Sequence, residues 1–127
     1  MSDIRLIDIL YDGATEPIHC EKISNTIYRC LESCIFIDFI HYGCEIEVEE
    51  KDDKLVFLGL YRESPYAEFF YVWSKEIVAS KKVEKMKEEI MTLGGNWENA
   101  MGGVFIIHLP KEKEGEINRL LELLKVE

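Results

Sequence analysis

Cysteine and histidine side chains gather in the first 44 residues, and they are the first candidates for chemistry. They are His19, Cys20, Cys30, Cys34, His41 and Cys44. Structural zinc sites take four such ligands, and they usually present two of them from one short Cys-x-x-Cys turn. Here consecutive cysteines are ten, four and ten residues apart, with apolar residues around them. We therefore predict no metal and no cofactor, and we expect buried thiols that pack as small hydrophobic side chains.

The same segment holds the residues of a nucleophilic or acid–base site. Asp38 lies inside an apolar run, residues 36–40. A buried carboxyl group there would have a raised pKa, whereas a carboxyl group that points to water is an ordinary surface residue. Catalysis also needs a base, His41 or His108, in contact with a thiol such as Cys34 or Cys44. We predict no catalytic residues, and we keep Asp38, His41 and Cys34 as the candidates if an enzyme is present.

Aromatic side chains form a second candidate site. Residues 61–73 contain Tyr61, Tyr66, Phe69, Phe70, Tyr71 and Trp73, with Arg62 beside them. Alternation along a strand places Phe69, Tyr71 and Trp73 on one face. Such a stripe packs in a core, or it forms a binding patch where it is exposed. The candidate binding residues are Arg62, Tyr66, Tyr71 and Trp73.

An acidic row follows from the alternation of residues 45–49. If Ile46 and Val48 face a core, then Glu45, Glu47 and Glu49 share the outer face, about 7 Å apart. Such a row either protects a sheet edge from aggregation or docks a basic partner. We favour edge protection, because it needs no partner, and we keep the acidic face as the alternative binding site.

The remaining motifs exclude several classes of protein. The sequence contains no glycine-rich phosphate loop, no Gly-x-Ser-x-Gly and no His-Glu-x-x-His. His108 shares a strand face with Ile106, opposite Phe105, Ile107 and Leu109, and we interpret it as a structural histidine.

The net charge and the lack of long apolar runs exclude further kinds of partner and location. The 127 residues carry 15 basic and 25 acidic side chains, a net charge of −10. Residues 1–63 alone hold 6 basic and 14 acidic side chains, a net charge of −8. This acidity disfavours nucleic acids and anionic membranes as partners. No apolar run approaches the ~20 residues of a membrane span, and the first residues lack a signal peptide, so we expect a cytoplasmic protein with reduced thiols.

Hydrophobic periodicity predicts the elements. We expect strands at 4–11, 27–31 and 68–73, a weaker extended piece at 17–24, and hairpins at 45–61 and 96–109. Residues 35–40 form either a strand or a short helix. Amphipathic helices follow at 80–93, between Ser80 and Gly94-Gly95, and at 114–125. Gly59 marks a bulge or a close backbone approach.

These elements predict one α+β domain over residues 1–127. Its sheet is mostly antiparallel, with two helices packed on one face. A β-rich front part covers residues 1–75. The back part, residues 66–127, has the order strand–helix–hairpin–helix of a ferredoxin-like split β-α-β fold without its last strand.

The middle of the chain resembles an uncharacterised bacterial family, domain of unknown function 4265. The similar stretches are Ile27-Tyr28-Arg29, Ile35-Phe36-Ile37, Tyr42-Gly43-x-Glu45-Ile46-Glu47-Val48, Leu55-Val56-Phe57, Arg62-Glu63-Ser64 and Leu93-Gly94-Gly95. The resemblance covers about residues 25–125. It implies a bacterial, cytoplasmic, single-domain protein and no particular activity. Ser64-Pro65 stands where the family has Ser-Gly or similar.

A non-enzymatic binding or interaction module is the function that the sequence favours. Its partner is a protein with a basic surface or a small ligand, and one form of it is an antitoxin-like or immunity-like protein. The alternative is a small enzyme with a site near Asp38, His41 and Cys34 or Cys44.

Overall fold

The structure is a computed structural model that describes residues 3–125. It is an α+β protein with antiparallel sheets, and the chain divides into two compact units, Met1–Pro65 and Tyr66–Glu127. Each unit has its own sheet and its own cluster of buried side chains. The expectation of one domain stays a prediction, and each unit is described by itself.

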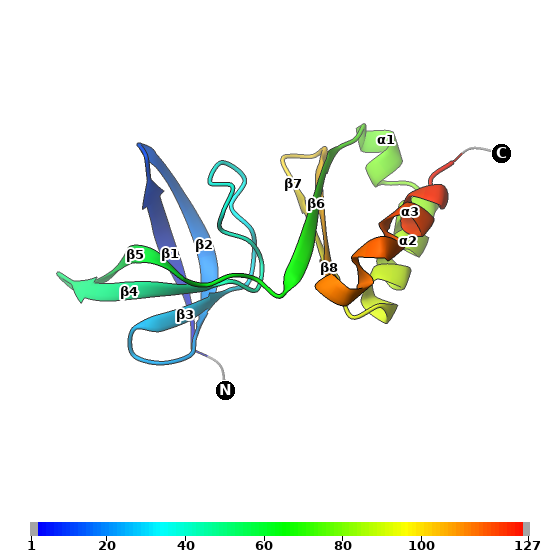
Figure 1. Cartoon of the computed structure of the whole chain (residues 1–127). Helices are drawn as coiled ribbons and strands as arrows, with labels where there is room; N and C mark the ends of the chain where they lie inside the picture. Colours follow the sequence, from blue (N-terminus) through cyan, green and yellow to red (C-terminus); the bar gives the residue numbers. More distant parts are fainter. Residues whose placement is uncertain (1–2, 126–127) are drawn as a thin grey trace. The chain divides into compact units, whose positions relative to one another are not determined.

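Unit 1 is a five-stranded antiparallel meander, shown in blue to green in Figure 1. Its strands are β1 (Ile4–Tyr11), β2 (Ala14–Lys22), β3 (Ile27–Cys30), β4 (Glu45–Lys51) and β5 (Lys54–Arg62), and they pair in this order. The two end strands, β1 and β5, lie beside each other, so the sheet curls around its inner face. That inner face holds a core that includes Ile7, Ile9, Ile18, Ile46 and Val48.

Tight turns set the registers of the two outer hairpins. Asp12 and Gly13 have φ angles of 49° and 81° between β1 and β2. Asp52 and Asp53 have φ angles of 52° and 64° between β4 and β5, as a type I′ turn requires. The expected bulge at Gly59 is confirmed, because Glu47 pairs with Gly59 whereas Val48 pairs with Phe57.

Residues 35–40 form neither a strand nor a helix, so both alternatives for this run are wrong. The run is a series of bends and turns between β3 and β4. Its first amides donate to the carboxylate of Glu16, at 2.6 Å from Ile35 and 2.9 Å from Phe36. The Glu16 side chain thus accepts the backbone hydrogen bonds that a neighbouring strand would otherwise accept. Ile37 is still buried in the core of unit 1.

Unit 2 is a three-stranded antiparallel sheet with its helices on one side (Figure 1). Its elements are β6 (Tyr66–Val72), α1 (Lys75–Val78), α2 (Lys81–Thr92), β7 (Asn96–Ala100), β8 (Val104–Pro110), the 3-10 helix η1 (Lys111–Glu116) and α3 (Ile117–Glu122). The strand order is β6-β8-β7. Buried side chains of α2, β8 and α3 form one core cluster, which contains Val83, Met86, Ile90, Phe105, Ile107, Leu109 and Leu120.

Capping residues explain where α2 begins and ends. The side chain of Ser80 accepts a hydrogen bond from the amide of Val83, and Gly94 follows the helix with a φ angle of 84°. Both caps agree with the sequence prediction. The last helix differs from the expected 114–125, because residues 111–116 wind as a 3-10 helix and α3 proper covers only Ile117–Glu122.

Candidate functional site

The four cysteines lie in one buried cluster of unit 1 and are free thiols. Cys20 pairs with Cys30 across β2 and β3, and the Sγ atoms of Cys30 and Cys44 are 3.5 Å apart. Hydrogen bonds with Cys20 and Cys44, together with burial, raise the pKa of Cys30. The hydrogen bond with Cys30 lowers the pKa of Cys44, and the charge of His41 acts in the same direction. Among residues 3–125, no group of three or more His, Cys, Asp or Glu side chains is arranged to hold a metal ion.

The candidate catalytic residues come together only in part. His41 lies beside Cys44, because the carbonyl oxygen of His41 accepts a hydrogen bond of 3.0 Å from the Cys44 amide. Cys34 is buried, and burial raises the pKa of its thiol. Asp38 is exposed and, within the described part of the chain, forms neither a hydrogen bond nor an ion pair. Asp38 is thus an ordinary surface residue.

The aromatic candidates pack inside unit 2. Tyr71 and Trp73 stack at 5.2 Å between ring centroids, Trp73 stacks on Phe105 at 5.1 Å, and all three belong to the core between sheet and helices. Tyr66 begins β6 and is half-buried. These placements suit packing, and a binding role for these residues stays a prediction.

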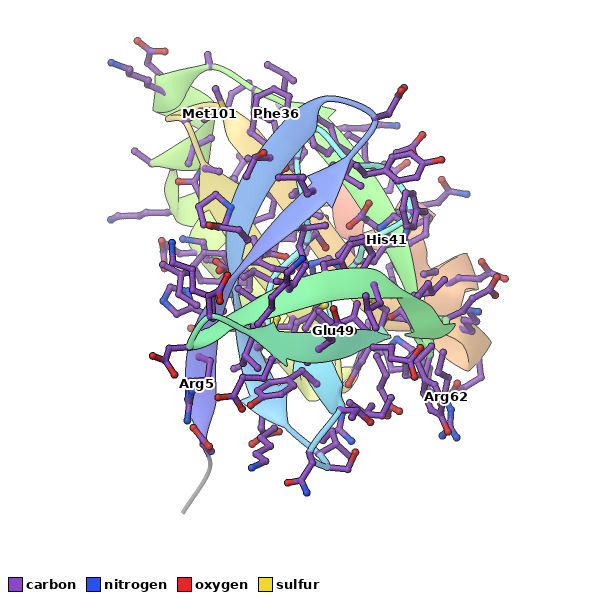
Figure 2. The ribbon with its side chains drawn as sticks, turned by 90° about the vertical axis from the view of Figure 1, so that its left-hand side faces the viewer. Arg5, Phe36, His41, Glu49, Arg62 and Met101 are labelled. Atoms are coloured by element: carbon purple, nitrogen blue, oxygen red, sulfur yellow. The ribbon has the colours of Figure 1, made fainter. Side chains whose placement is uncertain are left out.

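The acidic row lies on the outer face of β4, as Ile46 and Val48 are buried. The edge-protection interpretation is wrong, because β4 lies between β3 and β5 and is not an edge strand. Glu45 is only 13% exposed at its side chain, and its carboxylate lies 3.6 Å from the guanidinium of Arg29. Glu47 and Glu49 are exposed, and Figure 2 labels Glu49 on the outer surface of β4.

A row of alternating charges offsets the repulsion at Glu45. Glu21, Arg29, Glu45 and Arg62 are successive register partners across β2, β3, β4 and β5. Arg29 lies 3.4 Å from Glu21 on one side and pairs with Glu45 on the other. Opposite charges directly across strands stabilise a sheet. Arg62 and Glu45 therefore have a role within the sheet, and Glu47 and Glu49 are left as the outward-facing acids of this strand.

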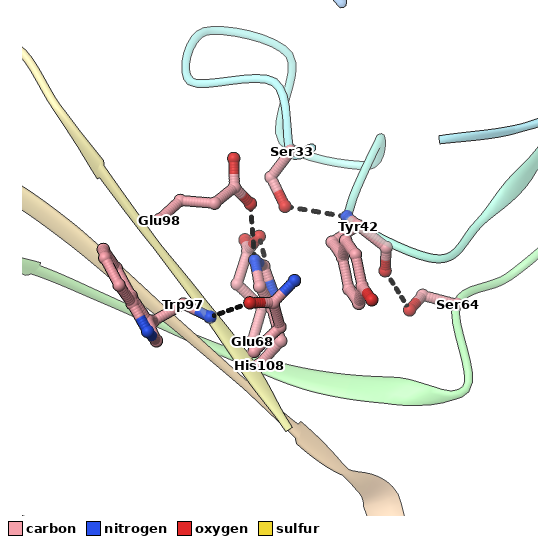
Figure 3. Close-up of polar contacts among 8 residues, drawn as sticks. Ser33, Tyr42, Ser64, Glu68, Trp97, Glu98 and His108 are labelled. Carbon is pink, nitrogen blue, oxygen red and sulfur yellow. Dashed lines mark hydrogen bonds and ion pairs between the residues drawn. The ribbon is translucent and has the colours of Figure 1, made fainter. Parts of the chain in front are cut away.

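Unit 2 contains a histidine flanked by two carboxylates, on the sheet face opposite the helices. His108 is buried, and its Nε2 lies 2.5 Å from Oε2 of Glu98 on β7 (Figure 3). Its Nδ1 lies 4.0 Å from Oε1 of Glu68, the register partner of His108 on β6. The sequence analysis missed both glutamates, although period two placed His108 away from the helix-facing core.

An apolar face on β1 and β5 is the main feature of unit 1 that the sequence analysis missed. Its members are Ile4, Leu6, Leu10, Val56 and Leu58. They are between 38% and 64% exposed, and they make up five of the fifteen exposed large apolar residues among residues 3–125. They alternate with inward-facing residues along two neighbouring end strands. Exposed apolar patches on soluble proteins commonly mark interaction sites.

Carboxylates flank this apolar face. Asp8 is exposed on β1 between Leu6 and Leu10. Glu49 pairs with Val56, and Glu47 pairs with Gly59, across β4 and β5. An apolar centre with a charged rim is the usual anatomy of a protein–protein interface. The face combines apolar side chains with negative charge at its rim.

Comparison with known proteins bears on the fold alone. No family model matches the chain, and no curated protein matches it. The structure is similar to a crystal structure of a hypothetical protein from Neisseria gonorrhoeae, with a TM-score of 0.60 and 16% sequence identity over 96% of this chain and 88% of that one. Within residues 3–125, none of the helices has the length and apolar character needed to cross a membrane.

Proposed function

We propose that the protein is a non-enzymatic interaction module that binds a protein partner through the apolar face on β1 and β5. The observation that carries the proposal is the exposure of five large apolar side chains on two adjacent end strands.

The negative charge of unit 1 indicates what kind of surface a partner needs. Residues 1–63 have a net charge of −8, and Asp8, Glu47 and Glu49 flank the apolar face. A partner with apolar anchors and a rim of lysine and arginine is complementary to this surface, and opposite charges accelerate association. An immunity-like or antitoxin-like protein that covers a basic enzyme is one form of such a module.

A quantitative affinity capture tests the proposal. The full-length chain is immobilised, exposed to a lysate of its source cells, and compared with Leu6→Asp and Leu58→Asp variants by mass spectrometry. We expect one basic protein that the wild type retains and both variants lose. Its retention falls in the Glu47→Gln/Glu49→Gln variant and at high salt.

The control is Met91→Asp, which changes an exposed apolar residue of α2 far along the chain. It should retain the partner as the wild type does. Circular dichroism confirms that each variant is folded. The proposal fails if no protein distinguishes the wild type from Leu6→Asp and Leu58→Asp, or if Met91→Asp loses the same partner.

A small enzyme with a thiol nucleophile remains the second candidate, and the environment of Cys44 is the observation that favours it. Its pKa is lowered, and His41 is adjacent. Thiol alkylation of the native protein tests this function. Preferential modification of Cys44 at neutral pH supports it, whereas four thiols that react only after unfolding contradict it, since a nucleophile must be accessible.

We also propose finer assignments for the fold and the cell compartment. The order β6-β8-β7, with α2 between β6 and β7 and α3 after β8, supports a ferredoxin-like split β-α-β fold for unit 2. The hydrogen-bonded thiols of Cys30 and Cys44 are compatible with a cytoplasmic protein. Membership of domain of unknown function 4265 rests on the sequence resemblance.

A further inference from the structure

A polar pocket opens at one end of the curled sheet in unit 1. It has a volume of about 460 Å³, and its wall includes Arg5, Lys22, Tyr28, Glu50, Asp53 and Lys54. These residues come from all five strands and the β4–β5 turn, so distant parts of the chain converge here. Pockets of this size hold small molecules, and most such pockets are apolar. The polar wall therefore selects a polar ligand.

Positive charge is concentrated in this pocket. Residues 1–63 contain only 6 basic side chains against 14 acidic ones, and three of the six, Arg5, Lys22 and Lys54, line its wall. Within the described residues, neither Lys22 nor Lys54 takes part in an ion pair. Arg5 pairs with Asp3 at 3.1 Å, but its side chain is 56% exposed and its guanidinium has further N–H donors. Their positive charge is available to a ligand.

The other polar groups of the wall complement the three cations. Tyr28 is buried, and burial raises the pKa of its phenol, which therefore stays protonated and can donate a hydrogen bond. Glu50 and Asp53 form no ion pair among residues 3–125, and their carboxylates can accept hydrogen bonds from hydroxyl or amino groups.

We propose that this pocket binds a small polar anion, one that carries a phosphate or carboxylate group together with hydroxyl or amino groups. Lys22, Lys54 and Arg5 bind the anionic group, and Glu50 and Asp53 bind the donors of the same molecule. The pocket is separate from the apolar face, so this site does not depend on the proposed protein partner.

Titrations of the full-length, isotope-labelled protein test the site by NMR at constant ionic strength. Inorganic phosphate is the first probe and succinate is the second, because the two distinguish a phosphate site from a carboxylate site. We expect saturable shifts of the backbone amides of Lys22 and Lys54 with at least one probe. Sodium chloride alone should not cause them.

Charge variants locate the interaction. Lys22→Gln and Lys54→Gln should each weaken binding of the active probe about tenfold, since each removes a hydrogen bond to a charged group. Glu50→Gln should strengthen binding. Lys51→Gln is the matched control, because Lys51 precedes the same turn but does not line the pocket. Thermal melting shows whether each variant is folded.

Two results would overturn the proposal. One is the lack of a saturable shift with both probes. The other is equal weakening by Lys51→Gln and by the two pocket lysine variants, which would indicate that the acidic unit attracts counterions to any lysine without a specific site.

Discussion

His108 is a buried polar side chain of unit 2 with carboxylates on both sides. It is buried between two strands that each contribute a carboxylate, Glu98 at 2.5 Å and Glu68 at 4.0 Å. Sequence alternation could place His108 opposite the helix-facing core, but it could not show its partners. They depend on β8 pairing with both β6 and β7, a strand order that local periodicity does not contain.

Loss of the Glu98 carboxylate should destabilise unit 2. Glu98→Ala leaves a buried imidazole nitrogen without its 2.5 Å acceptor, and we expect the free energy of unfolding to fall by about 1–3 kcal/mol. Urea unfolding followed by tryptophan fluorescence measures it, because both tryptophans, Trp73 and Trp97, lie in unit 2. Glu88→Ala, on the exposed side of α2, is the control. Equal effects of the two changes would contradict a structural role for the pair.

The thiol of Cys34 should make unit 1 less stable at alkaline pH. Burial raises its pKa in the folded protein, so the unfolded chain loses this proton first as the pH rises. Above about pH 8.5, the ordinary thiol pKa, the free energy of unfolding should fall by up to about 1.4 kcal/mol per pH unit for this group. Circular dichroism during urea unfolding at increasing pH measures the slope. Cys34→Ala should reduce it, and an unchanged slope would count against the buried thiol.

Turns and helix caps are the elements that the sequence predicts best. Ser80, Gly94 and the hairpin at 45–61 are predicted from residue type and periodicity, because caps and hairpin turns are local structures whose hydrogen bonds close within a few residues. The secondary structure of residues 35–40 is predicted wrongly for the opposite reason. Its first amides bond to Glu16, about twenty residues earlier, and no local pattern reports such a contact.

Two substitutions of one residue in the β4–β5 turn should change the stability of unit 1 in opposite directions. Asp52 and Asp53 both have positive φ, which is unfavourable for residues with a Cβ atom. Asp53→Gly should relieve this strain and stabilise unit 1 by about 0.5 kcal/mol, net of the entropy cost of glycine. Asp53→Ala should destabilise it by about 1 kcal/mol, because alanine disfavours this backbone region. Both variants remove the same charge, so an effect of charge alone would give both the same sign.

Residues 3–125 contain two clusters of buried side chains, and the cysteines and tryptophans that can report on unfolding are divided between them. All four cysteines lie in unit 1, and both tryptophans lie in unit 2. The sequence analysis expected one domain, because periodicity finds buried faces without showing which faces share a core. Because thiol reactivity reports on unit 1 and tryptophan fluorescence reports on unit 2, the expectation of one domain can be tested.

We expect the two units to unfold in separate transitions, since each buries its own apolar cluster. Ile90 is fully buried in the cluster of unit 2, and Ile90→Ala should lower the free energy of that transition by about 2–5 kcal/mol. Urea unfolding is followed by tryptophan fluorescence and, in parallel, by the reactivity of the buried thiols. The fluorescence midpoint should shift while the thiol midpoint stays in place. Ile46→Ala, in the core of unit 1, is the reciprocal control and should shift only the thiol transition. If either change moves both midpoints together, the chain unfolds as one cooperative domain, and the sequence-based expectation of a single domain is correct.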